Sequence, residues 1–157
     1  MKQAFILFIC LFSLPLTAQH NIDFDQYFHD QTLRIDYYHS GNATDEYITI
    51  DNIYLQNTWA GNPDNLIQTY NMGKYSAKVH DLATNEIIFS TGYSTIFSEY
   101  QTTGPAHNGI SRTYHETVLI PRPKKNFLFI IEKRDRYNIL NPLYKLVIDP
   151  DDYHIIT

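Results

Sequence analysis

The sequence predicts an all-β protein, an antiparallel two-sheet β-sandwich of about seven to eight strands that follows a cleaved signal peptide. Composition is the first indication: thirteen Tyr and nine Phe stand with many Ile, Thr and Val against only two Met. Aromatic and β-branched residues favour strands. The second indication is the alternation of apolar and polar residues in several segments. The third is the regular occurrence of turn residues between those segments.

The first two strands are predicted at residues 33–39 and 46–55. In the first, Leu33, Ile35 and Tyr37 fall on one face and alternate with polar residues, which is the pattern of a half-buried strand. The second segment shows a weaker form of the same pattern.

The middle of the chain predicts a short helix and then a β-hairpin. Residues 64–70 follow a proline and give a short apolar face, suited to a helical turn or two. Residues 75–80 alternate apolar and polar, and residues 87–97 do so again after the turn residues Thr84 and Asn85. Two alternating segments joined by a turn indicate a hairpin.

The last three strands are predicted at residues 112–120, 126–136 and 144–149. The segment 126–136 differs from the others because apolar residues occupy both of its faces. It is therefore the candidate for a central strand that is covered on both sides. No internal repeat or linker divides the domain, which is expected to span residues 19–157.

Residues 1–18 have the features of a secretory signal peptide. A positive charge at Lys2 precedes an apolar run over residues 4–16, and the small residues Thr17 and Ala18 follow at the expected cleavage site. The run is too short for a membrane span, and no later segment approaches the ~20 apolar residues that a span needs. A lipid anchor at Cys10 is the alternative, but this cysteine lies inside the apolar run. We expect an exported protein, periplasmic or secreted, with no membrane span.

The net charge limits which partners the domain is expected to bind, and the cysteine content limits how the domain can be stabilised. The formal net charge is −5, and losing the +1 of Lys2 with the leader makes it −6. This charge argues against nucleic acid as a partner, because phosphate binding needs clustered Lys and Arg. Cys10 is the only cysteine, so the domain is expected to be held by packing without disulfides.

The segment RTYHETVLI contains a His-Glu pair that invites comparison with a zinc peptidase motif. Such a motif places two histidines at i and i+4 on one helical face, beside a catalytic glutamate. Here the fifth position is Leu119, so the second histidine is missing. The β-branched residues and the following Pro121 favour a strand, in which His115 and Glu116 face opposite sides. We expect His115 to be a half-exposed strand histidine.

Other candidates for chemistry lack a recognisable motif. The seven histidines have no close ligand spacing, although assembly of three through the fold stays open; they are His20, His29, His39, His80, His107, His115 and His154. An acidic corner either holds calcium or simply forms a turn; it consists of Asp149, Asp151 and Asp152. A small hydrolase is disfavoured, because no paired acid and base stand at reactive spacing.

The most distinctive feature of the composition is its high content of aromatic residues. Most are needed to fill the core of a sandwich without disulfides. Some are candidates for a flat surface that binds sugar rings or a protein partner, and we select Tyr38, Trp59 and Tyr100.

Several separated blocks resemble one known family. They are FDQYFHDQTLRIDYYHSGNATDE, WAGNPDNLIQTYNMGKY, FSTGYSTIFSEYQTT, RTYHETVLIPRPKKN and IDPDDYHII. In this order they are similar to the N-terminal domain of the IgA-peptidase family of secreted zinc metallopeptidases. The resemblance extends from about Phe24 to the end of the sequence.

The resemblance implies a β-sandwich that precedes a larger catalytic domain, in which a His-Glu-x-x-His helix binds zinc. This sequence stops at Thr157, where the resemblance places the start of that domain. No catalytic residue or metal ligand is carried over, and no cofactor is expected in this chain. The first hypothesis is a non-catalytic accessory module that supports or positions a peptidase domain, with an apolar patch near the C-terminal end. The alternative is a glycan-binding or adhesive sandwich.

Overall fold

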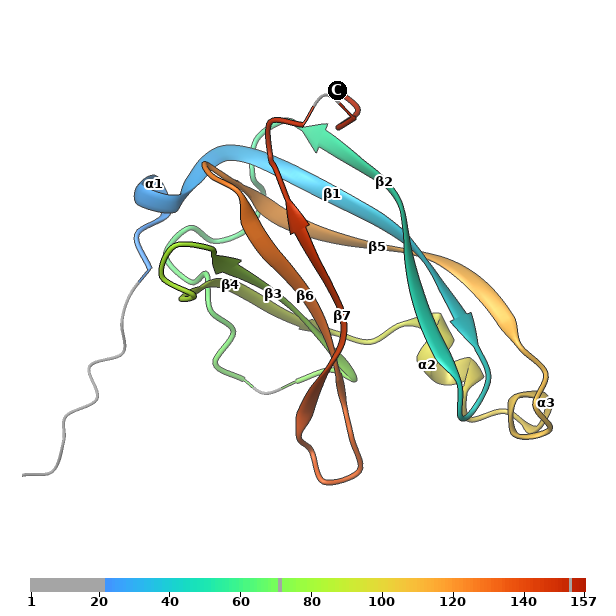
Figure 1. Ribbon diagram of the computed structural model, residues 1–157. Coiled ribbons are helices and arrows are strands. Elements are labelled where there is room, and N and C mark those ends of the chain that lie inside the picture. The colour runs from blue at the N-terminus through green and yellow to red at the C-terminus, as the bar shows by residue number, and fades with distance from the viewer. Residues whose placement is uncertain (1–21, 71, 153) are drawn as a thin grey trace, which may run out of the picture.

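The structure is a computed structural model that describes residues 22–70, 72–152 and 154–157, so the predicted signal peptide lies outside the described residues. Two antiparallel sheets make up the described chain, one with the order β2-β1-β5 and the other with the order β4-β3-β6-β7 (Figure 1). The strands are β1 (Phe28–Gly41), β2 (Glu46–Gln56), β3 (Tyr75–Asp81), β4 (Ile87–Tyr93), β5 (Arg112–Pro123), β6 (Phe127–Arg134) and β7 (Leu140–Ile148). This arrangement confirms the predicted all-β sandwich.

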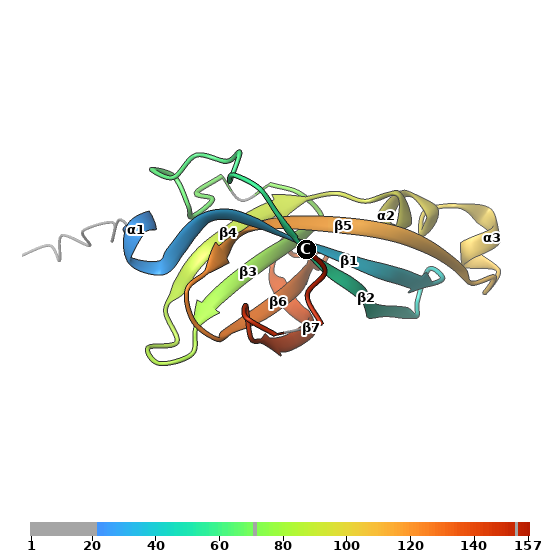
Figure 2. The same ribbon diagram turned by 90° about the horizontal axis from the view of Figure 1, so that it is seen from above.

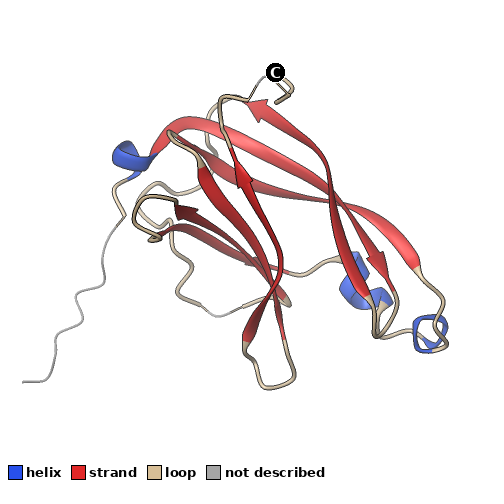
Figure 3. Ribbon diagram, viewed as in Figure 1, coloured by secondary structure: helices blue, strands red, loops and turns tan. Residues whose placement is uncertain are grey.

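Three short helices complete the described elements: α1 (Phe24–Tyr27), α2 (Ile96–Tyr100) and α3 (Gly104–His107). The strands of the β2-β1-β5 sheet are long and extend beyond the other sheet at one end, where α2 and α3 lie (Figures 1 and 2). Strands nevertheless dominate the chain (Figure 3). No helix in the described part of the chain is long and apolar enough to cross a membrane.

The core lies between the sheets and follows from the alternation of the strands. Leu33, Ile35 and Tyr37 of β1 point inward and are fully buried, as the period-two pattern predicts. The β6 strand pairs with both β3 and β7, which confirms its central position. Phe129 and Ile131 face the core and Ile130, on the opposite face, is also buried, so β6 is covered on both sides at its centre.

The predicted hairpin of β3 and β4 forms with the expected turn. Asp81 accepts hydrogen bonds at Oδ2 from the backbone N and the hydroxyl of Thr84, and Asn85 adopts a positive φ of 58°. Asn tolerates this left-handed conformation better than most residues. The turn between β3 and β4 is therefore determined by residues that the sequence already identifies as turn residues.

Two local predictions are wrong. Residues 64–70 form no helix, because Leu66 and Gln68 pair their backbone with Ser90 at the edge of β4. The strand predicted over residues 87–97 ends at Tyr93, and Phe97 lies in α2. Thr95 caps that helix by accepting a hydrogen bond from the backbone N of residue 98, and this cap ends the extended conformation.

Candidate functional site

A cluster of buried charged and aromatic side chains lies between the sheets, at the end that α2 covers. His39 of β1 is at its centre, with Glu46 of β2 and Glu116 of β5 on either side. These three residues occupy the inward rows of neighbouring strands, so the register of the β2-β1-β5 sheet brings them together. Tyr75 of β3 and Lys133 of β6 approach from the opposite sheet.

The imidazole of His39 is held at both nitrogens. Nδ1 lies 2.7 Å from Oε2 of Glu116, and Nε2 lies 2.8 Å from Oε1 of Glu46. The exposed fractions of the His39, Glu46 and Glu116 side chains are 1%, 5% and 9%. Because ionised carboxylates only accept hydrogen bonds, both ring nitrogens must donate, and His39 carries a positive charge.

Glu46 links the two sheets. The hydroxyl of Tyr75 donates to Oε1 of Glu46 over 2.7 Å, and the ammonium of Lys133 donates to Oε2. The side-chain amide of Gln101, just after α2, also donates to Oε2 over 3.2 Å. One carboxylate thus receives hydrogen bonds from both sheets and from the segment that follows α2.

The α2 helix covers the cluster with Phe97. The ring of Phe97 stacks on the His39 imidazole with centroids 4.1 Å apart and an interplanar angle of 25°. The backbone N of Phe97 donates to Oε1 of Glu116 over 3.2 Å. The helix therefore excludes water from the imidazole and also supplies a hydrogen bond to the second carboxylate.

These contacts set the ionisation of the cluster. Burial alone would raise the pKa of Glu46, but the hydrogen bonds from His39, Lys133 and Tyr75 outweigh it and lower that pKa from 4.5 to about 2. Burial likewise opposes ionisation of His39 and Glu116. Their hydrogen bond and charge attraction nevertheless raise the pKa of His39 and lower the pKa of Glu116.

The cluster is suited to cross-linking the fold. Both nitrogens of His39 are engaged, so in this state neither has a free lone pair for a metal or a substrate proton. Among the described residues, no group of three or more His, Cys, Asp and Glu side chains is placed to hold a metal ion. The chemical consequence of the arrangement is a salt-bridged connection of five strands, shielded by α2.

The cluster predicts a bell-shaped dependence of stability on pH. Glu46 has its pKa lowered from 4.5 to about 2, so its contribution, about 3 kcal/mol at 1.36 kcal/mol per pKa unit, is present above pH 4.5 and lost towards pH 2. His39 has its pKa raised from 6.5, so its contribution is full below pH 6.5 and lost as pH rises through the folded-state pKa. Urea unfolding across this range measures both limbs. The prediction is contradicted if the free energy of unfolding of His39→Gln still falls at alkaline pH as it does in the native protein. His115→Gln is the control.

The His-Glu pair lies in β5, as predicted. His115 faces outward, with Nε2 3.1 Å from Oδ2 of Asp51 and its ring centroid 5.1 Å from that of Tyr38. Glu116 faces inward to His39. The two side chains point to opposite sides of the sheet, so they do not form the adjacent pair that a zinc peptidase motif requires.

The three selected aromatics do not come together on one exposed surface. Tyr38 is 41% exposed on the outer face of β1, beside His115. Trp59 is partly buried against Phe89 in an edge-to-face contact. Tyr100, the last residue of α2, is only 4% exposed in a small apolar cluster with Phe97 and Ala106. It donates its hydroxyl hydrogen to the carbonyl oxygen of Ile110.

The acidic corner forms a turn. Oδ1 of Asp149 accepts from the backbone N of Asp151, and Oδ1 of Asp152 accepts from the backbone N of His154. Asp151 pairs with Arg122. These contacts account for the Asp-Pro-Asp-Asp sequence as a turn.

Comparison with known proteins supports the resemblance seen in the sequence. The family described as "Peptidase M64 N-terminus" matches residues 23–145, which is most of the chain and nearly all of the described sandwich. No curated protein matches the sequence. The matched family is that of an N-terminal domain. The chain therefore belongs to the peptidase M64 N-terminal domain family.

Proposed function

We propose that this domain is a non-catalytic accessory module that supports or positions a peptidase domain through protein contact. The observation that carries the proposal is the position of the His-Glu pair in β5, with His115 outside the sandwich and Glu116 inside it. Hydrolysis by a zinc peptidase needs a metal-activated water and an adjacent base. Neither residue is placed for that role.

The proposed contact surface lies at the end of the sandwich where the C-terminus is found (Figure 1). Ile156 forms a parallel bridge with Tyr54 of β2. Its backbone N donates to the carbonyl oxygen of Ile53, and its carbonyl oxygen accepts from the backbone N of Leu55. The Ile156 side chain is 43% exposed, and Val147 near the end of β7 is 55% exposed. Exposed apolar side chains at adjoining sheet edges are suited to a domain interface.

The test measures binding to the peptidase domain of a protein from this family, produced as a separate chain. We expect calorimetry to detect association. The double variant Val147→Ser with Ile156→Ser is expected to weaken it by about thirtyfold, because the two exposed apolar contacts together contribute on the order of 2 kcal/mol. The matched control is Tyr137→Ser with Ile139→Ser, because these exposed residues lie in the β6–β7 turn at the opposite end.

Two results contradict the proposal. One is zinc-dependent proteolysis by the purified domain alone. The other is an association that is absent, or that the control pair weakens as much as the Val147 and Ile156 pair does.

A further inference from the structure

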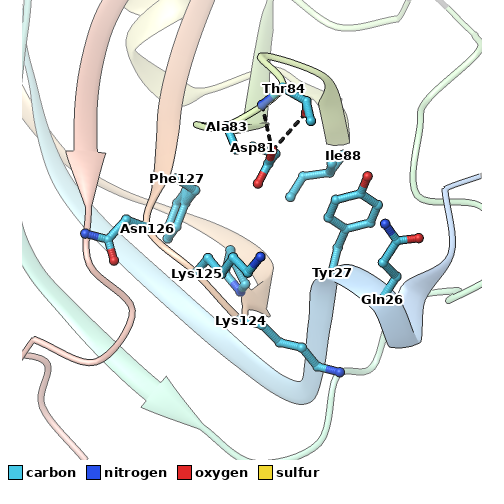
Figure 4. A pocket seen from close by; sticks show the side chains of 11 residues that line it. Gln26, Tyr27, Asp81, Ala83, Thr84, Ile88, Lys124, Lys125, Asn126 and Phe127 are labelled. Carbon is cyan, nitrogen blue, oxygen red and sulfur yellow. Dashed lines mark hydrogen bonds between the residues drawn. The ribbon is translucent and has the colours of Figure 1, made fainter.

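A hollow separate from the charged cluster lies where α1, the β3–β4 turn and the β5–β6 turn meet (Figure 4). Its volume is about 180 Å³, less than the roughly 300–1,000 Å³ of pockets that hold drug-sized ligands. The hollow therefore has room for one small molecule.

The walls of the hollow combine apolar surface with charged side chains of both signs. Tyr27, Ile88 and Phe127 supply the apolar surface, while Asp81 and Lys125 supply a carboxylate and an ammonium group. Figure 4 shows Lys125 extending into the hollow between Phe127 and Tyr27, with Asp81 above it. No ion pair joins Asp81 to Lys125 among the described residues.

Each charged group retains capacity to bind a ligand. Asp81 is 9% exposed, and both hydrogen bonds from Thr84 go to its Oδ2. Its Oδ1 accepts no hydrogen bond within the described residues, so this oxygen is open to a donor group of a ligand. The neighbouring Lys124 is engaged with the carbonyl of Asp25, whereas Lys125 has no hydrogen-bond or ion-pair partner in the described chain.

The wall chemistry discriminates among classes of ligand. A small anion would be repelled by Asp81, and a small cation by Lys125. A zwitterion without an apolar face, such as glycine, would pair with both charges but leave the apolar wall uncovered. A purely apolar molecule would desolvate both charges without pairing them, which is costly. A neutral molecule with several hydroxyl groups donates to Asp81 and accepts from Lys125, while its C–H face packs on the ring of Tyr27. We infer that this hollow binds a single neutral sugar ring.

The inference is tested by NMR titration of the protein with glucose, galactose and N-acetylglucosamine. At least one is expected to bind with a dissociation constant on the order of 1–10 mM, as suits so small a ligand, and to shift resonances of the lining residues. Lys125→Ala is expected to weaken that binding by about tenfold, the effect of losing a hydrogen bond to a charged group. Lys145→Ala, at an exposed position of β7, is the matched control and leaves binding unchanged.

A second variant tests the carboxylate. Asp81→Asn keeps a carbonyl oxygen for Thr84 but presents an amide donor to the hollow, so sugar binding is expected to disappear while the turn is retained. The inference is overturned if none of the three sugars binds, if glycine binds and the sugars do not, or if Lys125→Ala binds as tightly as the native protein. If Asp81→Asn fails to fold, the titration of Lys125→Ala alone tests the inference, because Lys125 is exposed.

Discussion

Replacing Glu46 by Gln is expected to lower the free energy of unfolding by about 3–5 kcal/mol, the effect of removing one partner from a buried ion pair. The Glu46 carboxylate accepts hydrogen bonds from His39, Tyr75 and Lys133. Glutamine has the same size but no charge, and its amide group places N–H donors against these donors. His39 and Lys133 then keep their charges in the interior with reduced compensation. Removing the partner leaves a desolvation cost that is greater than the net contribution of the pair.

Urea unfolding at neutral pH measures this loss. Glu99→Gln in α2 makes the same chemical change at an exposed carboxylate, and it is expected to change stability by less than about 0.5 kcal/mol. The Glu46 variant should also lose the part of the acid limb that reports the lowered pKa of Glu46, while Glu116, whose pKa is lowered as well, keeps its own part. Similar unfolding midpoints for the Glu46 and Glu99 variants would show that the cluster does not cross-link the sheets.

The strands were predictable because their signal is local. The alternation in Leu33, Ile35 and Tyr37 marks the inward face of β1 without any knowledge of its neighbours. The β3–β4 turn is similarly marked by its own residues. The predicted helix over residues 64–70 failed because pairing with Ser90 at the β4 edge satisfies the backbone better than an isolated short helix can.

The charged cluster was not predictable as a unit, because it depends on the register of strands far apart in the chain. One local signal does exist. The inward row of β1 continues from Tyr37 to His39, and the inward row of β6 continues from Ile131 to Lys133. A charged residue that continues an apolar period-two row is a candidate for a buried, paired group, but its partners Glu46 and Glu116 follow only from the fold.

Replacing Phe97 by Ala is expected to destabilise the protein by about 3–5 kcal/mol, the usual cost of truncating a buried Phe. The Phe97 side chain is fully buried, and its ring stacks on the His39 imidazole. Alanine leaves a cavity beside a charged ring, and the loss therefore includes both packing and the shielding of His39 from water. Thermal and urea unfolding measure this change.

Two substitutions in the same helix separate these effects from a loss of helicity. Ile96→Ala alters an exposed neighbour of Phe97 and is expected to have little effect. Phe97→Leu keeps an apolar side chain over the imidazole and should recover a large part of the stability that Phe97→Ala loses. If Ile96→Ala destabilises as much as Phe97→Ala, α2 contributes through its own folding. If only the Phe97 variants destabilise, α2 contributes by covering the charged cluster. This second result is the expected one, because a five-residue helix is too short to be stable without tertiary contacts.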